Sequence, residues 1–132
     1  MARFEPKASP LTEPFWDATR DKKLLVQWCP DCDAGVYWPR VHCPRCLGGD
    51  LGWKEASGRG SVYSFSVMHV AGNPMMADRV PYVIGLVDLD EGVRIATNIV
   101  GCEPAAVRVA MAVAVTWETM SDGRNLPLFE PA

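Results

Sequence analysis

Cys29-Pro-Asp-Cys32 and Cys43-Pro-Arg-Cys46 are two C-x-x-C pairs separated by ten residues. Each pair can direct two thiolates at one ion from a tight turn, and two pairs complete the tetrahedral sphere that zinc prefers. Four protein ligands leave no coordination position for a catalytic water. The spacing therefore predicts a structural zinc site whose ligands are Cys29, Cys32, Cys43 and Cys46.

The four cysteines have other conceivable uses, as two disulfides or as a redox-active pair. The sequence shows no signal-peptide pattern and no apolar run long enough to span a membrane, so we expect a cytoplasmic protein. Cytosolic thiols stay reduced, which favours metal binding over disulfides. Four thiolates suit iron as well as zinc, so a rubredoxin-like iron site is the alternative.

A small ribbon is predicted around the metal site, over residues 24–57. Residues 24–28 read as a strand that leads into the first cysteine pair, and residues 36–39 read as a strand before the second. Residues 51–55 form a short strand or a connector. Gly58 and Gly60 then mark the boundary to the next domain.

The N-terminal segment, residues 1–23, is predicted to combine an extended arm with a short helix. Pro6 and Pro10 favour an extended arm over residues 1–10, and Thr12 is a candidate cap for a helix that starts near Pro14 and continues towards Lys23. Such a helix is too short to be stable alone. Its Phe15 and Trp16 must therefore pack on the ribbon, on the C-terminal domain or on a partner chain, and the sequence does not choose among these.

The C-terminal domain, residues 58–132, is predicted to be a β-barrel. Strands are expected over residues 61–69, 82–87, 93–99 and 109–117, with a loop over residues 71–79 and a tight turn over residues 89–92. Tyr63, Phe65 and Val67 share one face of the first strand at period two. The alanines within residues 109–117 would also suit a helix, so a helix is the alternative to a strand there. The tail at residues 126–129 is expected to pack its apolar side chains on the barrel.

The distribution of charge bears on partners. Residues 1–60 hold nine Lys and Arg against eight Asp and Glu, whereas residues 61–132 hold four against eight. A surface that binds nucleic acid needs clustered cations to neutralise phosphates. The barrel is acidic instead, so nucleic acid is not the expected partner.

The order of these features resembles the DUF35 family, the acyl-CoA-associated OB-fold proteins with a rubredoxin-like zinc ribbon. The features are the aromatic N-terminal helix, the two C-x-x-C pairs, and the segments at residues 58–65, 81–87 and 90–92. The resemblance covers Phe15 to about Pro131. It implies a mainly β fold with a short N-terminal helix, a zinc ribbon and a C-terminal five-stranded OB-fold barrel.

What the family does is implied by the resemblance alone. Its members are similar to non-catalytic accessory subunits of thiolase-fold enzymes that act on acyl-CoA thioesters, in acyl transfer, condensation or retro-aldol cleavage, including that of steroid side chains. The chain departs from the family pattern at Ala110-Met111, where a Gly-Met pair is usual, and in the Met75-Met76 loop.

The chain offers few catalytic groups, which independently favours an accessory role. His42 adjoins the second cysteine pair, His69 ends a strand, and neither has a nucleophile beside it in the sequence. Cys102 lies in a turn with no neighbouring cation in the sequence that would activate its thiol as a nucleophile. Asp88, Asp90 and Glu91 occupy a hairpin tip, where carboxylates normally serve turn formation and solvation.

Arginines and aromatic residues provide the candidate binding sites. We expect a coenzyme A thioester to be shared with the partner, with Arg40, Arg45 and Arg59 as candidates for its phosphates, because guanidinium groups pair with phosphate oxygens. Solvated surface arginines are the alternative.

The aromatic residues around the ribbon have two interpretations. The first is that some of these rings pack between ribbon and barrel, because a ribbon has almost no core of its own; the residues are Trp28, Tyr37, Trp38 and Trp53. Any that are exposed could anchor a thiolase-fold partner, and Phe15, Trp16 and Trp38 are the candidates.

The alternative function, of a different class, is that of an OB-fold module that binds single-stranded nucleic acid. In that case Tyr63 and Phe65 would stack on bases, although such strand residues more often belong to the core.

Overall fold

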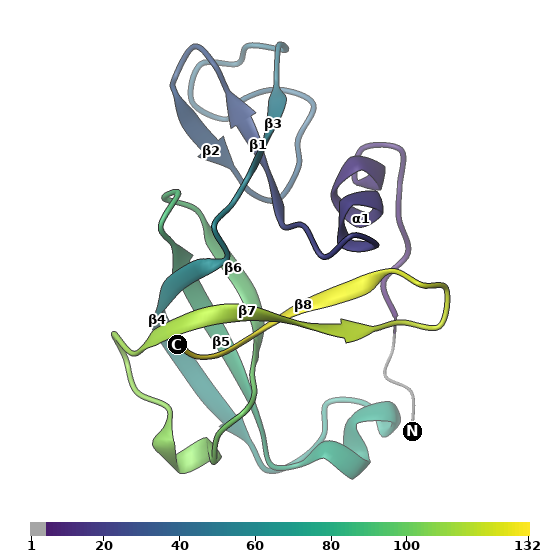
Figure 1. Cartoon of the computed structure of the whole chain (residues 1–132), viewed down its shortest axis with the longest axis vertical. Helices are drawn as coiled ribbons and strands as arrows, with labels where there is room; N and C mark the ends of the chain where they lie inside the picture. The colour runs from purple at the N-terminus through teal and green to yellow at the C-terminus, as the bar shows by residue number, and fades with distance from the viewer. Residues whose placement is uncertain (1–4) are drawn as a thin grey trace.

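The computed structural model describes residues 5–132, and residues 1–4 of the expected arm lie outside the described residues. A three-stranded sheet stands at one end of a five-stranded barrel, and a short helix lies beside the junction (Figure 1). The predicted mainly β fold, with an N-terminal helix, a zinc ribbon and a C-terminal OB-like barrel, is confirmed. Across the part of the chain that the structure describes, none of the helices is long and apolar enough to traverse a lipid bilayer.

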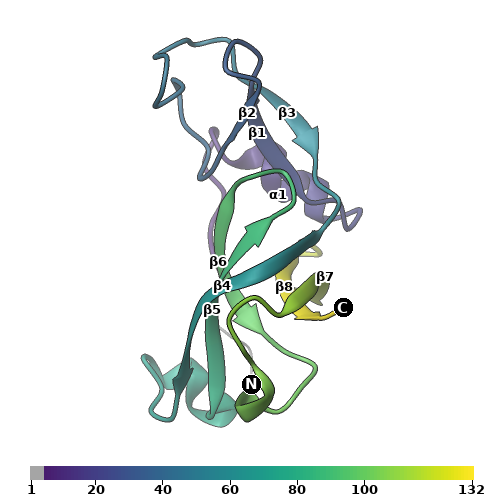
Figure 2. The ribbon, with the colours of Figure 1, turned by 90° about the vertical axis from the view of Figure 1, so that its left-hand side faces the viewer.

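The ribbon contains strands β1 (Leu25–Cys29), β2 (Ala34–Val36) and β3 (Gly52–Glu55), in the antiparallel order β2-β1-β3. The expected strand over residues 36–39 was misplaced, because β2 ends at Val36. Beyond it the chain leaves the sheet, and the rings of Tyr37 and Trp38 pack edge to face with centroids 5.1 Å apart. After β3 the chain runs directly from the ribbon into the barrel (Figure 2).

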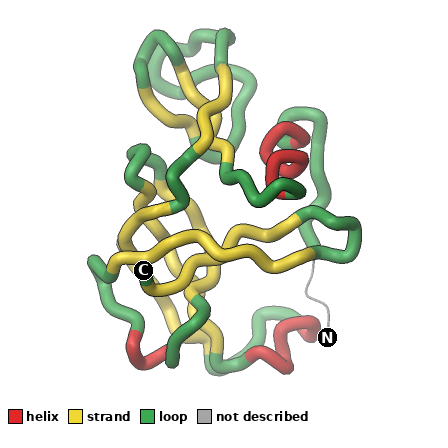
Figure 3. Tube along the Cα trace, in the orientation of Figure 1, coloured by secondary structure: helices red, strands yellow, loops and turns green. Residues whose placement is uncertain are grey.

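The barrel contains five strands in the closed order β4-β5-β6-β8-β7. Their bounds are β4 Arg59–Met68, β5 Tyr82–Leu89, β6 Arg94–Ile99, β7 Ala112–Thr119 and β8 Asn125–Pro131. Two 3-10 helices, η1 (Pro74–Arg79) and η2 (Pro104–Ala106), lie in the connections (Figure 3). The strand prediction for residues 109–117 is correct over the helix alternative, although pairing begins only at Ala112.

The C-terminal tail does more than cover the barrel. As β8 it lies between β6 and β7, antiparallel to β7 along its length and parallel to β6 at the Ile99 and Phe129 pair. Leu128 is 5% exposed and Phe129 is fully buried. The tail is therefore the strand that closes the barrel.

A β-bulge in β4 separates side chains that were expected to share one face. The register with β5 shifts between Val62 and Ser64, so that Val62 is buried while Tyr63 is 50% exposed. Phe65 is half-buried and packs against the core. The expectation that Tyr63 and Phe65 share a face was wrong, because a bulge adds one residue and reverses the alternation.

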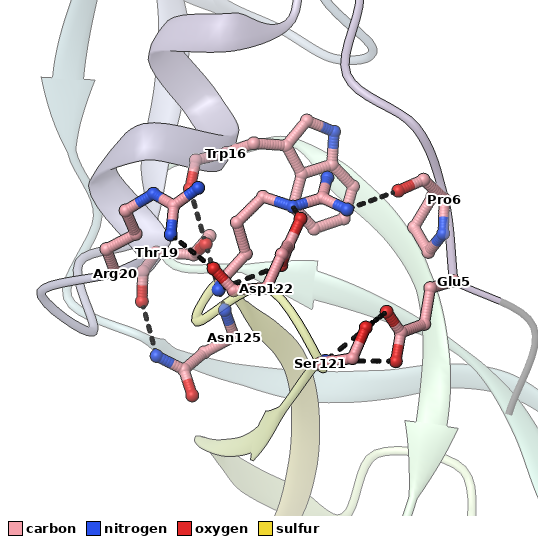
Figure 4. Close-up of polar contacts among 9 residues, drawn as sticks. Glu5, Pro6, Trp16, Thr19, Arg20, Ser121, Asp122 and Asn125 are labelled. Carbon is pink, nitrogen blue, oxygen red and sulfur yellow. Dashed lines mark hydrogen bonds and ion pairs between the residues drawn. The ribbon is translucent and has the colours of Figure 1, made fainter. Parts of the chain in front are cut away.

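Helix α1 (Glu13–Thr19) is shorter than expected, because the chain turns out of helical geometry before Lys23, with Lys22 at φ +57°. Its C-terminal end is held against the β7–β8 turn. Asn125 donates from its backbone N–H to Thr19 Oγ1 (3.2 Å) and from its side chain to the Thr19 carbonyl (2.8 Å) (Figure 4).

The N-terminal segment reaches the same turn of the barrel. Ser121 Oγ donates to the Glu5 carboxylate (2.7 Å), and Arg124 Nη2 donates to the Pro6 carbonyl (2.7 Å). The helix and the segment before it are thus fastened to one end of the β7–β8 pair.

One hydrophobic core joins helix, ribbon and barrel. Phe15 of α1 is 1% exposed and Val26 of β1 is 2% exposed, and both belong to the same buried cluster as Val87 and Phe129 of the barrel. The sequence left open where Phe15 and Trp16 pack. They pack between the ribbon and the barrel.

Candidate functional site

The four predicted metal ligands converge at one end of the ribbon. Their sulfur atoms all lie within 4.8 Å of one another, with Cys29 Sγ 3.7 Å from Cys46 Sγ and Cys32 Sγ 3.9 Å from Cys43 Sγ. A tetrahedron with Zn–S bonds of about 2.3 Å requires S···S separations of about 3.8 Å. The donor set and its spacing therefore fit a zinc ion closed on all four sides.

Backbone amides support the thiolates, as expected for two tight metal-binding turns. Cys32, Arg45 and Gly48 donate their N–H groups to Cys29, Cys43 and Cys46 Sγ at 3.5, 3.4 and 3.4 Å. The N–H groups of Cys46 and Arg45 lower the pKa of Cys43 to about 6. The side-chain hydrogen bond with Cys46 raises the pKa of Cys32 to about 12. A bound divalent cation would hold both thiols in the deprotonated form despite this difference in pKa, because a thiol that coordinates a metal is deprotonated outright.

The candidate catalytic groups are spread over the molecule. His42 is exposed in the ribbon, His69 is exposed just after β4, and Cys102 is half-buried in the turn after β6. Among the hydrogen bonds and ion pairs within residues 5–132, none joins Cys102 to either histidine. The structure thus assembles no nucleophile and base from these three residues.

The carboxylates at the β5–β6 hairpin have structural partners. Asp88 accepts from Arg94 Nε at 2.6 Å, and the Glu91 carboxylate accepts from the Ser57 backbone N–H at 2.9 Å. The second bond ties the hairpin tip to the linker between ribbon and barrel. Their roles are those expected of turn residues.

Two of the three candidate arginines line one hollow, and the third does not. A cavity of about 220 Å³ lies between ribbon and barrel, with Arg40 and Arg45 on the ribbon side and Arg94 on the barrel side. Arg59 is exposed at the start of β4 and is absent from the described residues that line the cavity. The sequence offered no signal for Arg94, because only the packing of the ribbon against the β5–β6 turn places it there.

The candidate interface aromatics differ in accessibility. Phe15 and Trp16 are 1% and 4% exposed, so their rings are buried in the core of this chain and cannot contact a partner. Trp38 is 39% exposed although its ring centroid lies 5.0 Å from that of Phe15. Only Trp38 presents much of its surface to a partner.

The remaining ribbon aromatics divide between core and surface. Tyr37 and Trp53 pack against the main core, and burial raises the pKa of Tyr37 to about 12. Trp28 carries Lys54 Nζ 4.2 Å above its ring. Exposed apolar side chains near the cysteine pairs include Val41 and Leu47.

Two hollows lie on the barrel wall beside η1. They have volumes of about 340 and 370 Å³, and both are lined by Met76, Tyr82, Asn98 and Leu128. Met76 is buried, whereas Met75 is 41% exposed. The Met75-Met76 loop, where the chain departs from the family pattern, therefore builds part of these hollows.

Tyr63 is the exposed aromatic residue of the candidate base-stacking pair. The guanidinium carbon of Arg94 lies 3.4 Å from its ring centroid, so one face of the ring is already occupied. Phe65 faces the core. The pair does not form a stacking platform.

The chain matches two family models in succession. Residues 16–52 match the model described as ChsH2, rubredoxin-like zinc ribbon domain, and residues 53–118 match the model described as ChsH2, C-terminal OB-fold domain. Together these matches cover the ribbon and most of the barrel.

Three curated proteins illustrate the similarity. A probable enoyl-CoA hydratase alpha subunit of Thermomonospora curvata is 34% identical over 100% of this chain, which spans 46% of that protein. A DUF35 domain-containing scaffold protein of Methanocaldococcus jannaschii is 33% identical over 78% of this chain and 82% of its own length. The benzoylsuccinyl-CoA thiolase subunit BbsA of Thauera aromatica is 34% identical over 74% of this chain and 65% of its own.

A solved structure matches nearly the whole chain. A chain of the Ltp2-ChsH2(DUF35) aldolase is 34% identical with a TM-score of 0.85, and the match covers 96% of this chain and 98% of that one.

Proposed function

The chain belongs to the DUF35 family of zinc-ribbon and OB-fold proteins, and from this membership we propose that it is a non-catalytic accessory subunit of an acyl-CoA enzyme. The observation that carries the proposal is the match to a chain of the Ltp2-ChsH2(DUF35) aldolase, because at 96% of this chain it includes helix, ribbon and barrel together. The dispersed positions of Cys102, His42 and His69 support it, since chemistry then has to come from another subunit.

The proposed partner is a thiolase-fold enzyme. BbsA, a relative of similar identity, is named as a subunit of a thiolase, and the structural relative is part of an aldolase. The hydratase name belongs to a protein of which this chain spans 46%, so hydration is not carried over. We propose acyl transfer, condensation or retro-aldol cleavage of an acyl-CoA thioester as the partner's reaction, with a steroid side-chain acyl-CoA as one candidate substrate.

The metal site serves this function by shaping the ribbon. Cys29, Cys32, Cys43 and Cys46 would hold zinc, which supplies folding free energy and has no open position for substrate. The neighbouring Trp38 is the proposed contact with the partner, because it keeps a large exposed surface on a ring held in place by Phe15.

Coenzyme A contacts are proposed to be shared with the partner. Arg40, Arg45 and Arg59 are the candidates from sequence, and the cavity between ribbon and barrel favours the first two. Arg59 is proposed as a phosphate contact only because it is exposed at the start of β4.

Affinity purification from the source organism tests the accessory role. The tagged chain should recover a thiolase-fold protein in fixed ratio, and nuclease treatment should not change the yield. Trp38→Ala should reduce that recovery, whereas Trp28→Ala should not, with zinc content and melting temperature confirming that both variants are folded.

Activity assays of the partner complete the test. We expect the partner to lose activity or stability without this chain. Full activity of the partner alone would contradict the proposal, and recovery of nuclease-sensitive partners would favour the nucleic-acid-binding alternative.

A further inference from the structure

The cavity between ribbon and barrel is lined by three arginines from two parts of the chain. Arg40 and Arg45 approach from the ribbon, one on each side of Cys43, and Arg94 approaches from the start of β6. The lining is completed by Gly35, Val36, Tyr37, Pro44, Gly92 and Val93, so no carboxylate is among the described residues that line it.

Arg40 is held in place by a buried amide. Gln27 is 5% exposed, and its side chain donates to the Arg40 carbonyl at 2.8 Å and accepts from the Arg40 N–H at 2.7 Å. A buried amide that satisfies both backbone groups of one residue fixes the path of the chain at that point. The loop that carries Arg40 is therefore ordered although its side chain is exposed.

Arg45 is positioned by the metal site. Its backbone N–H donates to Cys43 Sγ at 3.4 Å, inside the tight turn of the second cysteine pair. The same turn is closed by Cys43 N–H donating to the Gly48 carbonyl at 2.9 Å. The fold of the ribbon thus fixes the backbone of Arg45 at the wall of the cavity.

Arg94 is oriented by its neighbours on the barrel. Its Nε and Nη2 donate to Asp88 at 2.6 and 3.3 Å, and its guanidinium lies on the ring of Tyr63. These contacts use one edge and one face of the guanidinium and leave Nη1 for another acceptor.

We propose that this three-arginine cavity binds a phosphate group of the acyl-CoA thioester, with Arg94 as the cation that the barrel contributes. The inference rests on the proposed function for the choice of coenzyme A, while the cavity itself selects an oxyanion. Three arginines around one cavity suit a tetrahedral phosphate, whose oxygens can accept from several guanidinium groups. A compact pocket beside an acidic barrel does not suit a nucleic-acid strand, which needs a continuous cationic groove.

Asp88 is expected to weaken anion binding at Arg94. Its carboxylate neutralises part of the charge of Arg94, so a bound phosphate has to share Arg94 with it. Removal of this carboxylate should therefore strengthen anion binding, an effect that a purely structural role for the Asp88–Arg94 pair would not produce.

The test titrates the zinc-loaded full chain with coenzyme A at low salt, by NMR or calorimetry. Arg45→Gln and Arg94→Gln should each weaken binding roughly tenfold. Asp88→Asn should strengthen binding roughly two- to fivefold. Arg108→Gln is the matched control with the same change in net charge, because Arg108 is exposed just after η2 and is not among the described residues that line the cavity. The helix η2 lies at the end of the barrel away from the ribbon (Figure 3).

Several outcomes would overturn the inference. These are an absence of coenzyme A binding, equal losses in Arg94→Gln and Arg108→Gln, binding of inorganic phosphate as tight as that of coenzyme A, or preferential binding of a single-stranded oligonucleotide. Zinc content and melting temperature of each variant separate lost binding from lost folding.

The purification of a thiolase-fold partner is independent of this titration. If the partner is recovered but the chain does not bind coenzyme A, the cavity assignment fails and the accessory role stands. If coenzyme A binds as expected but no such partner is found, the accessory role fails and the cavity stands.

Discussion

Single residues show where this chain departs from the simplest backbone geometry. Ala110 has φ +70°, a left-handed conformation that glycine adopts freely and that costs an L-residue about 1 kcal/mol. The resemblance to DUF35 proteins marked this position as one where glycine is usual. The structure supplies the physical reason, because Ala110 lies in a turn held to β4 at Val62: the Ala110 N–H donates to the Val62 carbonyl at 2.8 Å, and the Val62 N–H donates to the Met111 carbonyl at 3.0 Å.

Ala110→Gly should stabilise the protein by up to about 1 kcal/mol, because it removes the left-handed strain, although the added flexibility of the unfolded chain offsets part of the gain. Urea unfolding measures the difference. Ala112→Gly, at an exposed position of β7 with ordinary φ, is the control and should instead destabilise by about 0.5–1 kcal/mol. Equal effects of the two substitutions would contradict the interpretation.

Asp122 makes the stability of the β7–β8 turn depend on pH. The Arg124 backbone N–H and guanidinium hold the pKa of this carboxyl below its usual value. A depressed folded pKa contributes stability above the unfolded pKa of about 4 and loses it as pH falls towards the folded value. The free-energy difference between wild type and Asp122→Asn should therefore shrink below about pH 4.

Urea titrations between acidic and neutral pH check this expectation. Loss of metal at low pH affects both proteins alike and cancels in the difference. Asp21→Asn, at another exposed carboxylate, is the charge-matched control, and a difference that grows on acidification would show that the sign is wrong.

Among the elements, the ribbon depends most on its metal ligands. Its local cluster contains Cys29, Val36 and Cys43, with Cys32 and Leu51 packed against it. Three of these five side chains are metal ligands, so little apolar surface remains to hold the cysteine turns. The ribbon should therefore fold only with its metal.

Cys46→Ser should abolish stoichiometric zinc binding and unfold the ribbon, because a structural zinc site contributes its binding free energy to folding. Metal analysis and NMR of the ribbon resonances measure both effects. Cys102→Ser is the control, since Cys102 lies outside the tetrad, and it should retain the metal and leave the partner's activity nearly unchanged. A red protein that contains iron would contradict the assignment of zinc.

At the scale of the whole molecule, the ribbon and the barrel meet through a close backbone approach. A Cβ atom on Gly35 of β2 would collide with Val93 Cγ1, next to the β5–β6 turn. Helix α1 packs at the same junction and shares its core with both parts. The three-arginine cavity exists because of this packing.

Gly35→Ala should destabilise the protein by about 1–3 kcal/mol, because the added methyl group overpacks the junction. It should also weaken coenzyme A binding by moving Arg40 and Arg45 away from Arg94. Gly52→Ala is the matched control in β3, where a Cβ meets no atom within 4 Å. Its stability should be unchanged or slightly increased, and similar losses in both variants would contradict the proposed contact.

Local features of the sequence determined much of the fold. The cysteine spacing defined the metal site because a C-x-x-C turn is a local structure, and most strands followed from alternation and turn residues. The tail was underestimated, because β8 becomes a strand only through pairing with β7 and β6, which are distant in sequence. The bulge in β4 was missed for a related reason, since a bulge is defined by the partner strand.

The sequence by itself determined which four cysteines come together as candidate metal ligands, the mainly β fold and the family, since these depend on residue type and spacing. Only the tertiary structure decided that Phe15 and Trp16 are internal, that Trp38 is exposed, and that Arg94 joins Arg40 and Arg45. Such outcomes depend on how the ribbon packs on the barrel. That packing is a non-local property, which no short stretch of sequence encodes.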